Sequence, residues 1–219
     1  MASLIYLCPT TRPDLSYAVN VLSRYMDKFD RRYWNAAKRM LQYLKRTVNF
    51  EIAFKSSGSF VLNGYCDSDS VGDRQTRKST SGYVFQICNG PVSRCAQRQS
   101  IVTLSSTEAE YVATSTAARE AVWLRQLLKD IGHPCASATM LNIDNQSAMQ
   151  IIKNPTFHRR TKHIDVQHHF IREKYECGVI NVQYIDTKSQ LADIFTKALA
   201  REPFEYLFKQ IGMFCMCDE

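Results

Sequence analysis

The sequence has little of what marks a membrane, secreted or disordered protein. No apolar run approaches the roughly 18 to 20 residues that a membrane helix needs, and no basic stretch leads into an apolar one at the start. Only 8 Gly and 6 Pro occur among 219 residues, and 45% of the residues are hydrophobic. This composition is globular rather than disordered. The sequence therefore predicts a soluble, unsecreted protein with one good-sized core, or one domain plus a fragment of another.

Cysteine and histidine motifs for metal binding are also missing. The eight cysteines are scattered and no pair has CxxC spacing, which favours free thiols in a reducing compartment. Four histidines lie close together without a matching cysteine or an HExxH pattern, so exposed or nucleic-acid-facing histidines are favoured over a metal site. They are His158, His163, His168 and His169.

The charge balance is basic, since Lys and Arg exceed Asp and Glu by 28 to 21. The resulting net charge of +7 and pI near 9.0 favour a polyanionic partner. The same excess spread over a solvated surface would serve solubility alone.

The chain divides into three expected parts without an internal repeat. Residues 1–50 are predicted to be helical, with segments over 13–26 and 31–45 that offer too little surface for a core of their own and must dock elsewhere. Residues 51–201 alternate strands and helices, and 202–219 form a short helical tail.

The middle part predicts a mixed α/β sheet covered by helices. The expected strands are 51–55, 60–66, 83–88, a short strand before Gln97, 139–143 and 179–185, with a turn at Asn89-Gly90. The expected helices are 103–130, 146–153, 165–175 and one opened by Thr187.

The helix expected over 103–130 carries two glutamates in its first turns. At about 100° per residue, Glu110 heads the apolar stripe and Glu108 lies roughly opposite. The stripe consists of Ala113, Ala117, Ala121, Leu124 and Leu128. Glu108 stands three residues after Ser105, the spacing of a capping box. A carboxylate on the core-facing stripe needs protonation, a cationic partner or a metal, because burying it alone is too costly.

Three aspartates favour the metal among these options. Asp67 and Asp144 each stand just beyond an expected strand, where strands deliver side chains to one edge of a sheet, and Asp193 joins them from the last helix. Four clustered carboxylates repel one another unless divalent cations hold them. Carboxylates with open positions for water and phosphate suit Mg²⁺. Two such ions about 3.5 to 4 Å apart promote phosphodiester cleavage, so the sequence predicts a nuclease.

Six motifs in order carry a family resemblance over nearly the whole chain: GYCDSD, TRKSTSGYVF, QRQSIVTLSSTEAEYVA, IDNQSA, RRTKHIDVQHHFIRE and QLADIFTKAL. Together they resemble the ribonuclease H domain of Ty1/copia-type retrotransposon polyproteins. The segment YLCPTTRPDLSYAVNVLSRYM resembles the connection that follows the family's reverse transcriptase. The resemblance implies a ribonuclease H-like fold, with a mixed five-stranded sheet flanked by helices, that cuts the RNA strand of RNA–DNA hybrids.

The resemblance also implies site residues and a cofactor. Its catalytic and metal-binding set would be Asp67, Glu110, Asp144 and Asp193, with two Mg²⁺ ions or, alternatively, Mn²⁺. Hybrid recognition rests on phosphates and 2′-hydroxyls. The candidates for it are Arg74, Arg77, Lys78, Asn145, Arg159, Arg160, Lys162 and His163. Such basic runs are more often a solvated face, Asn145 suits a helix cap better than a 2′-hydroxyl contact, and His163 suits a phosphate contact better than a general base.

The sequence departs from the family at two tryptophan positions, where it has Ser70 and Arg94. Loss of a buried Trp leaves packing space and typically costs about 3 to 5 kcal/mol. No polymerase, protease or integrase motif is present, so the chain resembles a fragment that formerly had a reverse transcriptase in cis. The family implies a cytoplasmic location, in virus-like particles of an intact element, or a nuclear one.

Three functional interpretations remain open. The first is a metal-dependent ribonuclease H. The second is a non-catalytic relic or a domesticated nucleic-acid-binding protein. The third, an integrase or resolvase of the same fold, is disfavoured because the chain lacks an HHCC module and DDE-type spacing.

Overall fold

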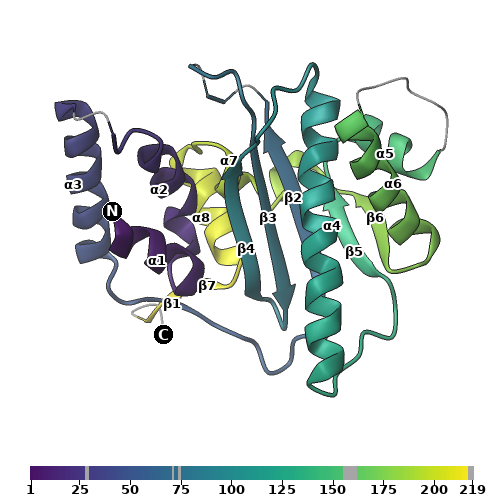
Figure 1. Cartoon of the computed structure of the whole chain (residues 1–219). Coiled ribbons are helices and arrows are strands. Elements are labelled where there is room, and N and C mark those ends of the chain that lie inside the picture. Colours follow the sequence, from purple (N-terminus) through teal and green to yellow (C-terminus); the bar gives the residue numbers. More distant parts are fainter. Residues whose placement is uncertain (28–29, 71, 74, 155–161, 217–219) are drawn as a thin grey trace.

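The computed structural model describes residues 1–27, 30–70, 72–73, 75–154 and 162–216, with the backbone alone over 162–168 (Figure 1). A five-stranded sheet occupies the centre, in the order β4-β3-β2-β5-β6. Its strands are β2 (Asn63–Asp69), β3 (Thr80–Ile87), β4 (Gly90–Arg98), β5 (Thr139–Ile143) and β6 (Ile180–Tyr184). Strand β2 pairs antiparallel with β3 and parallel with β5, so the sheet is mixed as predicted.

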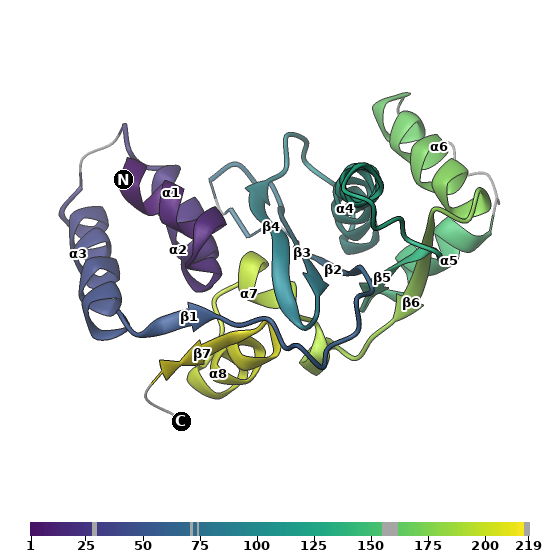
Figure 2. The same cartoon turned by 90° about the horizontal axis from the view of Figure 1, so that it is seen from below.

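Helices cover both faces of this sheet (Figures 1 and 2). One face carries α4 (Ser106–Asp130), α5 (Gln146–Lys153) and α6 (Lys162–Glu176), and the other carries α7 (Asp193–Thr196) and α8 (Arg201–Gln210). Alternation along β3 separates the two cores: Phe85 packs with the α4 side, and Val84 packs with α7 and α8. All eight residues of β3 are buried because both of its faces are covered.

Three local predictions were wrong. The tail expected to be helical over 202–219 continues α8 but then forms the strand β7 (Met213–Cys215). The turn between β3 and β4 consists of Cys88 and Asn89, both with positive φ (53° and 60°), rather than of Asn89-Gly90. Positive φ at both central residues is the pattern of a two-residue type I′ hairpin. The strand expected over 51–55 is β1 (Phe50–Ile52), which pairs with β7 (Met213–Cys215) outside the main sheet.

The N-terminal helices are α1 (Ala2–Thr10), the 3-10 turn η1 (Pro13–Leu15), α2 (Ser16–Ser23) and α3 (Arg31–Arg46). Of these, α1 and α2 lie along the edge strand β4, and α3 packs on the side of α2 away from the sheet (Figure 2). The N-terminal helices share a small apolar cluster that includes Leu4, Val19 and Met40. Asn20 donates to the carbonyl of Ala96 at 2.8 Å, which covers a free group of the sheet edge.

Arg94, at one expected tryptophan position, fastens β4 to the end of α1. Its guanidinium donates to the carbonyls of Cys8, Pro9 and Thr10 at 3.3, 2.9 and 2.7 Å. These are the carbonyls that a helix C-terminus leaves unpaired. A cavity of about 250 Å³ adjoins Arg94 between β4 and the helices. None of the described helices has the length and apolar character needed to cross a membrane.

Candidate metal centre

Strand pairing brings the first two candidate acids together. Asp144 directly follows β5, as predicted, but Asp67 lies inside β2, which continues to Asp69, rather than beyond the strand. In the parallel pair β2–β5, Tyr65 stands opposite Asn142. The same register continued by two residues sets Asp67 opposite Asp144. The sheet therefore delivers both carboxylates to one point.

The start of α4 supplies the third acid, and the two glutamates divide as predicted. The side chain of Ser105 accepts from the amide of Glu108 at 3.2 Å, and the Glu108 carboxylate accepts from the amide of Leu104 at 2.7 Å. The reciprocal contact thus reaches one residue further back than the cap residue itself. Glu110 is 6% exposed and accepts from the Ser68 amide at 3.2 Å. Its second oxygen, Oε2, is buried without a hydrogen-bond partner among the described residues.

One carboxylate oxygen each of Asp67, Glu110 and Asp144 lies within 4.8 Å of the other two. Burial, together with the charges of Asp67 and Asp144, raises the pKa of Glu110 well above its ordinary value. Burial likewise raises the pKa of Asp67, partly offset by Lys197. Hard oxygen donors at this spacing, one of them an unpartnered buried oxygen, fit a divalent cation such as Mg²⁺. Without a cation the same group is electrostatically unfavourable.

Asp193 stands beside this group rather than in it. It is the first residue of α7, whereas Thr187 opens only the 3-10 turn η2 (Thr187–Ser189), so the single helix expected from Thr187 is two short elements. Burial and the charge of Asp67 raise the pKa of Asp193 to about 7. Lys197, one helical turn further, contacts Asp193 Oδ1 at 2.9 Å and Asp67 Oδ2 at 3.7 Å. The structure therefore brings three of the four predicted acids together and pairs the fourth with a lysine.

Four residues at the site were missed from the sequence. Lys197 is one, and the hydroxyl of Thr196 donates to Asp67. Thr187 donates to Asp144 Oδ2 at 2.9 Å. Gln190 is fully buried and donates to the carbonyls of Cys66 and Asn142 at 3.0 and 3.3 Å, so it ties the ends of β2 and β5 together. Of these four residues, only Lys197 could have been found from the sequence, because its four-residue spacing from Asp193 places the two side chains on one helix face.

The residues predicted to contact nucleic acid differ in their surroundings: some are exposed, and others make hydrogen bonds within the protein. Arg77 is exposed, and Lys78 donates from Nζ to the carbonyl of Ser100 at 2.5 Å. Asn145 caps α5 by accepting from the amide of Ala148 at 2.9 Å, as favoured from the sequence. Arg74, Arg159 and Arg160 lie outside the described residues, as do the side chains of Lys162 and His163.

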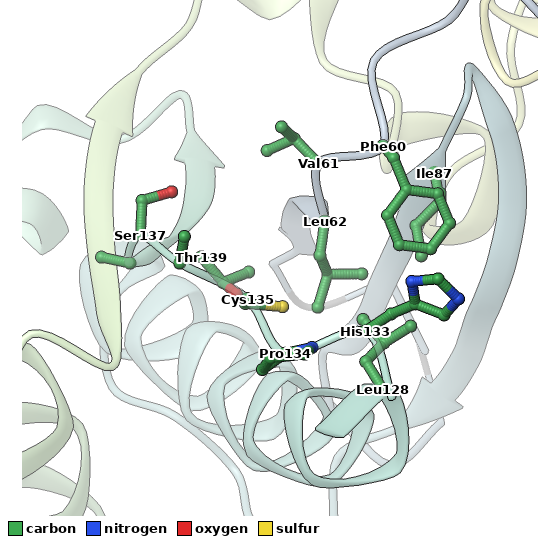
Figure 3. Close-up of a pocket in the computed structure, with 12 residues that line it drawn as sticks. Phe60, Val61, Leu62, Ile87, Leu128, His133, Pro134, Cys135, Ser137 and Thr139 are labelled. Atoms are coloured by element: carbon green, nitrogen blue, oxygen red, sulfur yellow. The ribbon is translucent and has the colours of Figure 1, made fainter. Parts of the chain in front are cut away.

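A separate apolar pocket of about 170 Å³ lies at the other end of α4 (Figure 3). Phe60, Leu62, Leu128 and His133 line it, and the rings of Phe60 and His133 pack 5.2 Å apart. An α-helix rises 1.5 Å per residue, which places Leu128 roughly 27 Å from Glu110 along α4. The pocket is therefore not part of the acidic site.

The mixed five-stranded sheet in this order, with helices on both faces and acids at the meeting point of β2, β5 and α4, defines a ribonuclease H-like protein. This confirms the predicted fold class. No family model matches the chain. It is 38% identical over 214 residues to the retrovirus-related Pol polyprotein from transposon TNT 1-94 of Nicotiana tabacum, and 39% identical over 213 residues to that from transposon RE2 of Arabidopsis thaliana. The homologues of this chain are thus retrovirus-related Pol polyproteins from copia-type transposons.

Each of these alignments covers 97% of the chain but only 16% and 15% of the respective relative. A shorter relative, the secreted RxLR effector protein 161 of Plasmopara viticola, is 45% identical over 124 residues, which are 57% of this chain and 87% of the relative. Among solved structures, LC11-RNase H1 in complex with an RNA/DNA hybrid matches 62% of this chain and 93% of its own, with 13% identity and a TM-score of 0.46.

Proposed function

We propose that the chain is a divalent-metal-dependent endonuclease that hydrolyses the RNA strand of RNA–DNA hybrids. The observation that carries this proposal is the convergence of Asp67, Glu110 and Asp144, with one buried glutamate oxygen left without a partner among the described residues. Sequence similarity to retrovirus-related Pol polyproteins supports it. A reverse transcriptase in cis and a cytoplasmic or nuclear location remain predictions of the family resemblance.

Asp67, Glu110 and Asp144 would hold the metal. Bound Mg²⁺ would supply activation of the attacking water and stabilisation of the leaving oxygen. Thr187 orients the Asp144 carboxylate, and Gln190 fixes the spacing of the two strands that carry the aspartates. Outer contacts of this kind commonly change metal affinity or activity by about 10- to 100-fold when they are removed.

Cleavage of a labelled RNA–DNA hybrid in Mg²⁺ tests the proposal. Asp144→Asn should slow cleavage by at least about 100-fold, because a direct ligand matters more than an outer contact. Asp130→Asn, at the far end of α4, is the matched control for loss of one carboxylate and should cut at the wild-type rate. Duplex DNA and duplex RNA of the same sequence should remain intact. If the wild-type chain cuts the hybrid no faster than Asp144→Asn, the proposed nuclease activity is refuted.

The second candidate function is a non-catalytic nucleic-acid-binding relic or domesticated protein. The contact of Lys197 with Asp193 favours it, because this carboxylate is then paired within the protein. A chain that binds the hybrid without cutting it, in Mg²⁺ or Mn²⁺, would support this alternative.

A further inference from the structure

The loop between β2 and β3 contains a turn organised by one buried aspartate, Asp73. We call Asp73 with residues 75–78 the Asp73 turn. Asp73 Oδ1 accepts from the amides of Gln75 and Thr76 at 3.0 and 3.3 Å. The Asp73 carbonyl accepts from the amide of Arg77 at 2.7 Å, and its own amide donates to the carbonyl of Lys78 at 3.2 Å. The conformation of the turn therefore depends on where the Asp73 side chain is held.

Two arginines from different parts of the fold hold that side chain. Asp73 Oδ2 accepts from Arg98 of β4 at 2.8 Å and lies 3.9 Å from Arg24 Nη1, which comes from the end of α2. The Asp73 side chain is only 3% exposed, so its charge needs cationic partners. Burial alone would raise the pKa of Asp73, but the bonds from Arg98 and from the Thr76 and Gln75 amides lower it well below its ordinary range.

Arg24 is a mostly buried arginine at the end of α2. Its side chain is 9% exposed, although a guanidinium is usually solvated. It donates to the hydroxyl of Thr80, at the start of β3, at 3.1 Å and to the side chain of Asn20 at 2.5 Å. Asn20 in turn donates to the Ala96 carbonyl of β4. The end of α2 thus contacts β3 and β4 through hydrogen bonds, and it contacts the loop through the ion pair between Arg24 and Asp73.

We propose that Arg24 is a positioning residue for substrate binding: through Asp73, it holds the turn that presents Arg77 to a nucleic-acid phosphate backbone. Arg77 is exposed and has φ +55°, a backbone conformation that a non-glycine residue keeps only when its surroundings hold it. The ligand in this inference rests on the proposed function, whereas the positioning rests on the contacts alone. Residues 1–27 are then part of the substrate-binding apparatus, beyond their packing against β4.

The test uses Arg24→Met in the full chain, which keeps the aliphatic stem and removes the guanidinium. Arg32→Met is the matched control: Arg32 also belongs to the N-terminal helices, but its side chain is 83% exposed and its ion pair is with Asp30. Amide hydrogen exchange of Gln75 and Thr76 is measured first, without substrate. Affinity for an RNA–DNA hybrid is then measured in Ca²⁺, and kcat and KM are measured in Mg²⁺. If Arg24→Met does not fold, Arg24→Gln replaces it.

We expect exchange of the two amides to quicken about tenfold or more in Arg24→Met, because the buried Asp73 carboxylate loses one of its two cationic partners. The hybrid dissociation constant and KM should rise severalfold, with kcat within about twofold, since phosphate contacts set affinity and not chemistry. Arg32→Met should match the wild type in amide exchange and in affinity for the hybrid. Unchanged exchange, or quickened exchange with unchanged hybrid affinity, overturns the proposal. If the wild type binds no hybrid, the proposed function fails, and the exchange data alone decide whether Arg24 holds the turn.

Discussion

Replacing Glu110 by glutamine should stabilise the metal-free protein at pH 8. Glutamine has the same shape and can still accept from the Ser68 amide, but it removes a charge that faces Asp67 and Asp144. At 4.8 Å and an effective dielectric constant of 20, each pair of charges repels by about 3.5 kcal/mol. Partial protonation limits this cost, so a gain of about 1 to 3 kcal/mol is expected. For a chain of this size that raises Tm by roughly 2 to 12 °C.

The sign of the effect depends on pH. The folded pKa of Glu110 lies above its unfolded value, so ionisation destabilises the folded state. The wild type therefore loses stability as pH rises from the unfolded pKa, about 4.3, towards the folded one. The advantage of Glu110→Gln should be large at pH 8 and vanish near pH 4, where both states carry a protonated glutamate.

Thermal unfolding in EDTA and in Mg²⁺ measures both arms of this prediction. Mg²⁺ should raise the Tm of the wild type, because a ligand that binds only the folded state stabilises it. It should raise the Tm of Glu110→Gln much less. Glu108→Gln is the matched control, two residues away on the same helix. It should lower stability slightly, because it removes a negative charge from the helix N-terminus, without changing the Mg²⁺ response. A Glu110→Gln protein less stable than the wild type in EDTA at pH 8, with an equal Mg²⁺ response, would refute the electrostatic reasoning.

Two further predictions concern cations supplied by the chain itself. Lys197→Met should increase the affinity for Mn²⁺ severalfold in calorimetric titration, because it removes a positive charge 3.7 Å from Asp67 Oδ2; equal or weaker binding would contradict this. Arg12→Met should lower the free energy of unfolding in urea by about 3 to 5 kcal/mol, because it leaves the fully buried carboxylate of Asp14 without its ion pair. A loss below 1 kcal/mol would show that this pair contributes little.

The parts of the site that follow from local periodicity were predictable. Helical spacing assigned Glu108 to the cap and turned Glu110 inward, and both positions are observed. The end of a buried strand located Asp144. The sequence predicts that the strand ends before Asp67, and an acidic run is indeed a poor strand former. The run continues β2 because antiparallel pairing with β3 extends to Asp69 opposite Thr80.

The parts that depend on contacts between distant segments were not predictable from spacing. Strand β1 pairs with β7, although Phe50 and Cys215 are far apart in the sequence. Gln190 contacts Cys66 and Asn142, which belong to two other strands. A polar residue in a loop has no periodic signal, so only the folded chain reveals that Gln190 is buried. The same holds for Arg24, whose helix gives no reason for a buried guanidinium.

Ser70 and Arg94 stand where the family has tryptophan, and they affect different parts of the structure. Arg94 faces the end of α1 and the cavity beside β4, so its effect falls on how the N-terminal helices dock. Ser70 is exposed after the end of β2, whereas Asp67 is held inside the strand by pairing with β3. The contacts that set the acids come instead from Ser68, Thr187 and Gln190. Because neither substitution removes one of these contacts, neither argues against the proposed nuclease, and cleavage of a hybrid in Mg²⁺ is the measurement that separates it from a relic.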